Sequence, residues 1–202
     1  MEWYMIAAVV GVGILVGFIN TLAGSGSVIS LPLLIFLGLP ANVANGTNRV
    51  SILLQNIVGV GSFYRKGKLD TGHGWVPSIA AVIGALVGAN IAADLNEELM
   101  EKAIGVLMVV MFFVILYKPN RWIKEKQEVK PQNIWLQIVI FFLVGVYGGF
   151  VQAGVGIFLL AALVLNAGYD LVKANALKLL IVLIYTPFAL AVFIFNDQVW
   201  WS

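Results

Sequence analysis

Long apolar segments constrain this chain more than any motif does. A helix needs roughly 20 mostly apolar residues to cross about 30 Å of hydrocarbon. Segments near that length cover 3–22, 48–64, 75–93, 99–117, 133–150 and 174–195. Hydrophobic residues make up 61% of the chain and charged residues only 11%. We therefore predict an all-α integral membrane protein, a polytopic bundle of transmembrane helices.

Two further apolar segments, 27–38 and 155–167, are short for a crossing. They are either short crossing helices buried inside protein or re-entrant segments that line a cavity, because broken backbone at membrane depth must avoid lipid. The first long segment carries Glu2 and no early Lys or Arg. We therefore expect a membrane helix there and not a cleaved signal peptide, whose n-region is basic.

Most cations gather in two loops. The first holds Arg65, Lys66 and Lys68, and the second holds Lys118, Arg121, Lys124, Lys126 and Lys130. The positive-inside rule makes both loops cytoplasmic in a multi-pass protein of the cell membrane. The intervening turn should lie outside, and its acidic residues are Asp94, Glu97, Glu98 and Glu101.

Composition argues against several functions. The net charge of +2 is too small to favour a nucleic-acid partner, and the absence of Cys excludes disulfides and thiolate metal sites. His73 is the only histidine, and no catalytic constellation such as HExxH is present. We expect no enzyme activity, no cofactor and no metal site.

The two halves of the chain share a pattern at one constant offset in sequence. The letters AGSG at 23–26 return as AGVG at 153–156, and AN at 44–45 returns at 174–175. The same offset also relates identical residues elsewhere: Leu33 corresponds to Leu163, Gly38 to Gly168 and Leu53 to Leu183. Such self-similarity predicts a duplication. We call this constant difference in residue number, which relates Gly24 to Gly154, the repeat offset.

The repeat offset divides the chain into a first transmembrane repeat over 1–117, a cytoplasmic basic loop over 118–132 and a second repeat over 133–202. The second repeat lacks an equivalent of the 75–117 hairpin. Either its last two helices are missing from this chain, or a partner subunit or a second copy in a homo-oligomer covers that face.

The orientation of the repeats depends on the segment 27–38. If it crosses the membrane, an odd number of crossings separates equivalent points and the second copy is inverted; if it is re-entrant, the copies run parallel. The distribution of cations favours the inverted arrangement, which is common in transporters.

Small residues recur at the spacing that lets membrane helices pack closely. The GxxxG pairs are Gly13 with Gly17, Gly84 with Gly88, and Gly145 with Gly149. In so glycine-rich a chain some of these pairs arise by chance.

The stretch TLAGSGSVISLPLLIFLGLPANVANGTNRVS, residues 21–51, interrupts an apolar region with polar residues and Arg49. Its glycines, and those at 153–156, allow the backbone to leave the helix. We predict that helices restart after ANGTN and KANA, where free N–H groups and the nearby cations Arg49 and Lys178 attract an anion. The predicted substrate site comprises Gly24, Ser25, Gly26, Asn45, Thr47, Asn48, Arg49, Gly154, Gly156, Asn175 and Lys178.

Each polar residue also has a structural interpretation. Arg49 and Lys178 can snorkel from helix ends to headgroups, and Asn45 and Asn175 can be ordinary helix N-caps. A further polar set can line a pathway, but we favour hydrogen bonds between helices for it; the set is Gln55, Asn56 and Gln152.

The same residues carry a resemblance to a known family. Residues 17–70, together with AGVG and KANALKLL in the second half, resemble the sulfite exporter TauE/SafE family. The resemblance implies a multi-pass plasma-membrane transporter of small sulfur-containing anions such as sulfite, sulfoacetate or related sulfonates. Members usually carry two further helices where this chain ends.

We therefore expect a transporter, an exporter by its resemblance, that holds a small anion between the two repeats within the lipid bilayer. Two alternatives stay open from the residues. One is a non-transporting membrane subunit or scaffold of a larger complex, and the other is a passive anion channel through the same site.

Overall fold

The computed structural model describes residues 11, 13–21, 24–69, 75–116, 133–166 and 168–201. These residues contain helices and no strand, which confirms the predicted all-α class. A helix over 13–21 precedes the labelled elements. Those are α2 (Ser27–Phe36), α3 (Ala41–Arg65), α4 (Trp75–Asp94), α5 (Glu97–Leu116), α6 (Ile134–Phe150), α7 (Val155–Ala161), the π-helical η2 (Ala162–Asn166) and α8 (Leu171–Phe195). The predicted basic loop 118–132 and His73 lie outside the described residues.

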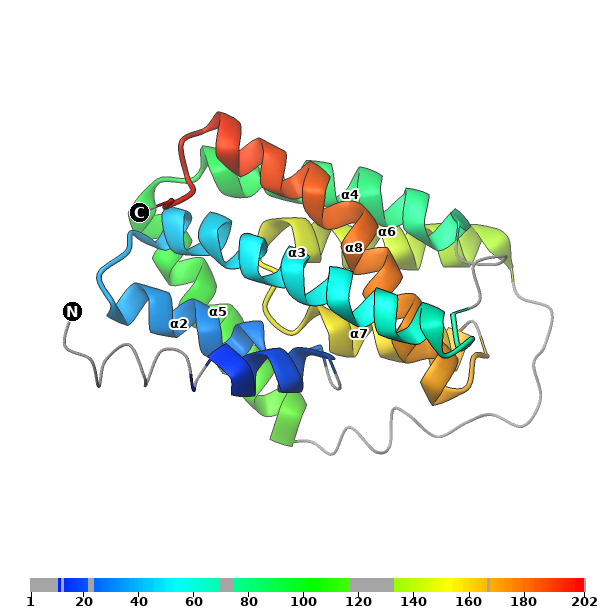
Figure 1. Ribbon diagram of the computed structural model, residues 1–202. Helices are drawn as coiled ribbons and strands as arrows, with labels where there is room; N and C mark the ends of the chain where they lie inside the picture. The colour runs from blue at the N-terminus through cyan, green and yellow to red at the C-terminus, as the bar shows by residue number, and fades with distance from the viewer. Residues whose placement is uncertain are drawn as a thin grey trace.

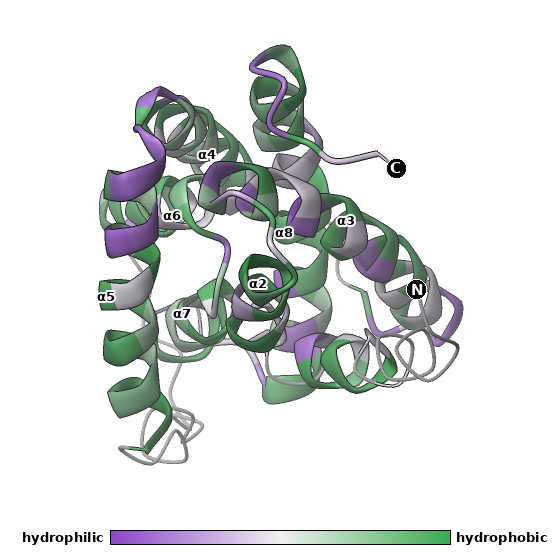
Figure 2. Ribbon diagram, turned by 90° about the vertical axis from the view of Figure 1, so that its left-hand side faces the viewer, coloured by the Kyte–Doolittle hydropathy of each residue, from purple (hydrophilic) through white to green (hydrophobic). Residues whose placement is uncertain are grey.

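Within the described part of the chain, three helices are long and apolar enough to cross a membrane, namely α4, α5 and α8. Of these α5 is the most exposed, with 17% of its apolar stretch buried against the rest of the chain. Figure 2 shows hydrophobic residues along most of α5, with hydrophilic residues in its first turns. Such a face suits lipid, since nothing polar on it would need a partner there.

The two short apolar segments are the returning arms of helical hairpins (Figure 1). In the first hairpin the chain reverses between 21 and 27, and a Cβ on Gly26 would collide with the carbonyl oxygen of Val16. In the second, Tyr147 of α6 stacks edge-to-face on Phe158 of α7 with ring centroids 5.2 Å apart. Of the predicted segment 3–22, the described residues 13–21 form the outgoing arm of the first hairpin, and the predicted segment 133–150 corresponds to α6, the outgoing arm of the second.

The long helices α3 and α8 lie side by side and run in opposite directions (Figure 1). Near the start of α3, a Cβ on Gly46 would collide with the carbonyl oxygen of Gln198, which follows α8. Near its end, a Cβ on Gly59 would lie 3.0 Å from Leu179 Cδ1, in the third turn of α8. The start of each helix therefore lies beside the end of the other.

The backbone follows the same repeat offset as the sequence. Both α3 and α8 have 25 residues, and their first residues, Ala41 and Leu171, are separated by that offset. Positive φ angles occur in matching pairs at Gly24 and Gly154, at Gly38 and Gly168, and at Gly67 and Asp197. An inverted duplication predicts this arrangement of equal helices running in opposite directions. Residues 3–10, 12 and 22 of the first predicted segment lie outside the described residues, so the predicted relation between re-entry and the orientation of the repeats stays a prediction.

Two of the predicted GxxxG pairs pack against each other. Added Cβ atoms on Gly84 and Gly88 of α4 would collide with carbonyl oxygens of α6, and those on Gly145 and Gly149 of α6 with carbonyl oxygens of α4. Residue numbers rise together along both helices, so α4 and α6 run parallel at backbone contact. The third pair differs: nothing described lies within 4 Å of a Cβ on Gly13.

Replacing Gly145 with leucine should destabilise the protein by about 3 kcal/mol or more, because the new side chain would meet the α4 backbone, which cannot move aside as a side chain can. Unfolding of the purified protein in mixed micelles measures the change. Gly105→Leu on α5 is the matched control, since open space surrounds that glycine. Equal stability of the two variants would contradict the close contact of α4 with α6.

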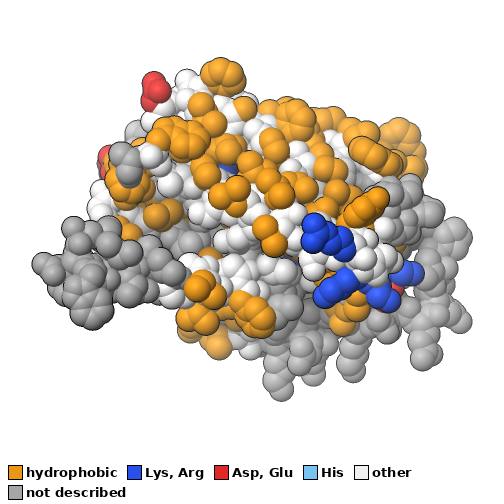
Figure 3. Space-filling view, viewed as in Figure 1, with side chains coloured by type: hydrophobic (Ala, Val, Ile, Leu, Met, Phe, Trp, Pro, Cys, Tyr) orange, Lys and Arg blue, Asp and Glu red, His pale blue; other side chains and the backbone are white. Residues whose placement is uncertain are grey.

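The two ends of the bundle carry opposite charges. Asn42, at the start of α3, donates a hydrogen bond of 2.7 Å to the Leu95 carbonyl in the acidic turn between α4 and α5. The exposed Arg65 and Lys66, at the end of α3, therefore lie at the opposite end. Figure 3 shows Lys and Arg side chains gathered at that end, with hydrophobic side chains over most of the face between.

Candidate functional site

The tips of the two hairpins meet inside the bundle. The Gly156 N–H donates a hydrogen bond of 3.2 Å to the Gly24 carbonyl. A Cβ on either glycine would collide with the Cα of the other, and Gly24 has a φ of 69°. Only glycine permits this approach at both positions. The contact brings the two halves of the sequence together at one point.

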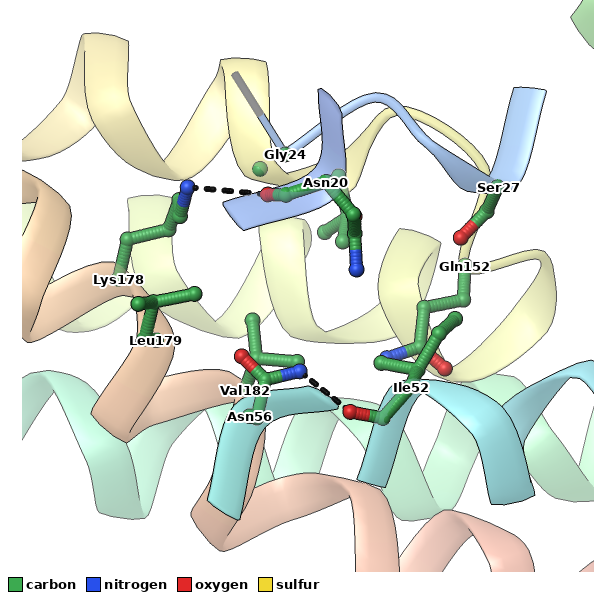
Figure 4. A pocket seen from close by; sticks show the side chains of 11 residues that line it. Asn20, Gly24, Ser27, Ile52, Asn56, Gln152, Lys178, Leu179 and Val182 are labelled. Carbon is green, nitrogen blue, oxygen red and sulfur yellow. Dashed lines mark hydrogen bonds between the residues drawn. The ribbon is translucent and has the colours of Figure 1, made fainter. Parts of the chain in front are cut away.

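A small pocket lies beside this contact (Figure 4). The space open to the centre of a water-sized sphere is about 10 Å³, close to the minimum for one water molecule. Both hairpins and both long helices contribute to its wall. The described lining residues are Asn20, Gly24, Ser27, Ile52, Asn56, Gln152, Val155, Gly156, Lys178, Leu179 and Val182.

Lys178 is the cation among these lining residues, and none of them is Asp or Glu. Its side chain is 1% exposed. The ammonium donates to Asn175 Oδ1 at 2.6 Å and to the carbonyls of Thr21 and Asn20 at 3.2 and 3.4 Å. Those carbonyls end the outgoing arm of the first hairpin, where the helix dipole is negative.

Arg49 occupies the corresponding place at the second hairpin. Its side chain is fully buried, and it donates to the carbonyls of Gly149 at 2.5 Å and Gly148 at 3.0 Å, at the end of α6. Its guanidinium also lies 4.6 Å from the centroid of the Phe193 ring. A weaker contact of 3.4 Å reaches Gln152 Oε1, and through that side chain Arg49 borders the pocket without lining it.

The two cations thus make reciprocal contacts. Arg49, from α3, caps the carbonyl end of an arm in the second hairpin, and Lys178, from α8, caps the carbonyl end of an arm in the first. Unpaired carbonyls at buried helix ends are costly, and a cation is the best partner for them. Both side chains point into the bundle, so neither is placed to snorkel to headgroups.

The predicted helix restarts after ANGTN and KANA were wrong. The helix α3 begins at Ala41 after Pro40, whose fixed φ suits a helix start, and α8 begins at Leu171. Asp170 caps α8 by accepting hydrogen bonds from the N–H groups of Val172 and Lys173. Asn45 and Asn175 therefore lie inside helices and are not N-caps.

The polar side chains predicted near those restarts bind protein groups. Asn45 donates to the Phe150 carbonyl at 2.8 Å, and Thr47 accepts from the Trp200 N–H at 2.9 Å. Asn48 accepts from the Ser30 hydroxyl at 2.6 Å. Asn175 accepts from Lys178, as described above. These contacts hold the hairpins and the C-terminal segment against the long helices.

Three of the eleven predicted site residues line the pocket: Gly24, Gly156 and Lys178. The others lie outside the lining, among them Gly26 against the first arm and Gly154 against the Met111 side chain of α5. Ser25 is partly buried outside the described lining. Sequence reasoning placed none of the polar side chains Asn20, Ser27, Asn56 and Gln152 at the site, although it noted Asn56 and Gln152 as candidates for a pathway.

Comparison with known proteins agrees with the apolar helices in pointing to a membrane protein. The family model for the sulfite exporter TauE/SafE matches residues 9–202. The chain belongs to this family. The TauE/SafE match covers both hairpins, both long helices and the pocket between them.

Two curated relatives are membrane proteins by name. A "Probable membrane transporter protein" of Haemophilus influenzae is 24% identical over 198 residues, which cover 98% of this chain and 77% of the relative. "Probable membrane transporter protein ORF9" of Sinorhizobium sp. is 26% identical over 207 residues, covering 100% and 77%. No solved structure matches the chain. Family and relatives identify this TauE/SafE member as a membrane transporter.

Proposed function

We propose that this transporter carries small sulfur-containing anions, such as sulfite or organosulfonates, out of the cell. The observation that carries the proposal is Lys178, a buried cation that lines the pocket where no described lining residue is acidic. A buried charge without a counter-ion is costly. An anionic substrate would supply the missing charge. Sulfur chemistry and the outward direction follow the description of the family.

The closed pocket supports a carrier rather than an open channel. One water molecule needs roughly 10–15 Å³ of such free volume, and a sulfur oxyanion needs several times more. A sulfur oxyanion therefore cannot enter the pocket in this conformation. Separation of the hairpin tips at Gly24 and Gly156 would enlarge it. Because the hairpins enter from opposite ends of the bundle, opening each in turn would expose the same site to each side of the membrane.

Uptake of labelled sulfite into proteoliposomes tests this function. We expect saturable uptake by the unmodified chain and a loss of about 100-fold in Lys178→Gln, because a charge-assisted contact in a dry site is worth several kcal/mol. Lys173→Gln is the matched control, since that lysine lies on the same helix but is exposed and paired with Asp170 at 3.7 Å. Equal uptake by the two variants would place the anion elsewhere. Uptake that rises linearly without saturation would favour a channel.

A further inference from the structure

The charge around the pocket is asymmetric although the fold around it repeats. At the first hairpin the cation lines the pocket, whereas at the second the cation is separated from it by Gln152. By the repeat offset, Lys178 is equivalent to Asn48, and Arg49 is equivalent to Leu179. Neither cation therefore has a cationic equivalent in the other half of the sequence. The substrate therefore meets one cation directly.

The two cations also hold their backbone carbonyls at different distances, although Lys178 has one short contact of 2.6 Å with Asn175 Oδ1. Lys178 reaches its two backbone carbonyls at 3.2 and 3.4 Å, longer than the 2.7–2.9 Å of strong charge-assisted hydrogen bonds. An entering anion would be a better acceptor than either carbonyl and can replace them. Arg49 has a short bond to the Gly149 carbonyl and a ring face beside it, and the Gln152 side chain lies between its guanidinium and the pocket.

We propose that Lys178 makes this pocket selective for oxyanions of charge −1 over those of charge −2. The inference rests on the proposed function and narrows its substrate class. A singly charged anion and one ammonium leave a neutral pair in the closed site. A doubly charged anion would leave an unbalanced negative charge among buried residues. The free energy needed to remove this anion from water would exceed the free energy of its attraction to one lysine.

Asn56 supplies a second element of selectivity. Its Nδ2 donates to the Ile52 carbonyl at 2.7 Å, which fixes the orientation of the amide, and its buried Oδ1 has no partner among the residues that the structure describes. A buried acceptor without a donor costs free energy that a ligand can recover. A monoanion carrying its own O–H or N–H, such as hydrogensulfite, would donate to Asn56 while its other oxygens accept from Lys178 and the Ser27 hydroxyl.

Thermal unfolding of the purified full chain in detergent tests both elements with three tetrahedral sulfur anions of similar size. Sulfamate carries charge −1 and N–H donors, methanesulfonate carries charge −1 without donors, and sulfate carries charge −2. At matched ionic strength, we expect methanesulfonate to raise Tm half-maximally at a concentration about tenfold below that of sulfate. Sulfamate should act at a still lower concentration.

Variants assign the effect to the residue. Lys178→Gln should lose the preference for methanesulfonate over sulfate, Lys178→Arg should keep it, and Lys173→Gln should behave as the unmodified chain. Sulfate acting at the same concentration as methanesulfonate, or no shift with either anion, would overturn the selection by charge. Equal action of sulfamate and methanesulfonate would overturn the role of Asn56.

The two proposals fail separately. Preference for methanesulfonate in a chain that moves no sulfite in vesicles would leave the selection by charge standing and remove the transport function. Saturable sulfite transport by a chain that binds sulfate as well as methanesulfonate would leave the transport function standing and remove the selection by charge.

Discussion

Replacing Arg49 with methionine is expected to cost about 3–5 kcal/mol of folding free energy, the largest effect of any single polar change in the bundle. Methionine nearly fills the volume of the arginine stem but donates nothing. The carbonyls of Gly148 and Gly149 would then be left without this partner inside the bundle. Each buried carbonyl that loses its partner costs about 1–3 kcal/mol.

The same variant separates the two interpretations of Arg49. As a cap on the end of α6, its loss should lower the unfolding free energy whether or not an anion is present. Arg65→Met is the control, because Arg65 is an exposed arginine at the end of the same helix, where we expect a change within about 0.5 kcal/mol. Arg49→Lys should fall between, since an ammonium keeps the charge but lacks the planar fork of guanidinium donors that fits the two carbonyls of α6. An Arg49→Met protein of normal stability that fails only to bind anions would make Arg49 a direct ligand, as the sequence predicts.

The second large effect is expected at the contact of the two hairpins. In Gly156→Ala the new methyl group would collide with the backbone of Gly24. Backbone atoms cannot rotate away from such a collision as a side chain can. We expect a loss of about 2 kcal/mol or more, with transport reduced at least as strongly, because the tips must move apart and the pocket between them changes shape.

Gly61→Ala provides the reference for this change. Gly61 lies in α3 with nothing within 4 Å of an added Cβ, so alanine there should be neutral or stabilising by up to about 1 kcal/mol. Stability is measured by unfolding in mixed micelles and transport by sulfite uptake. A Gly156→Ala protein as stable and active as Gly61→Ala would mean that the hairpin tips do not meet at this point in the working protein.

The helices themselves could be predicted from the sequence because their cause is local. Uninterrupted apolar runs over 75–93 and 99–117 correspond to α4 and α5 within a few residues. The starts of α3 and α8 were missed because the tertiary structure provides partners for asparagines that a bare helix would disfavour. Asn45, for example, is held inside α3 by its bond to the Phe150 carbonyl, 105 residues away.

The candidate site was harder to predict for the same reason. The two cations could be singled out because a charge beside long apolar runs needs a partner. Which one faces the pocket depends on where two hairpins meet, and no local pattern encodes that. Asn20 and Ser27 line the pocket because Gly24 turns the chain between them, so only the folded hairpin brings them to the wall.

In the transport that we propose, one closed pocket between the hairpins opens to each side of the membrane in turn. The chain has no cysteine, so Ser27→Cys places a single thiol in the pocket wall without further change. Labelling of this thiol by a membrane-impermeant maleimide, applied separately to each face of oriented vesicles, measures access directly. We expect slow labelling from both faces and protection by sulfite. Labelling from one face alone, or labelling that sulfite does not slow, would contradict alternating access through this pocket.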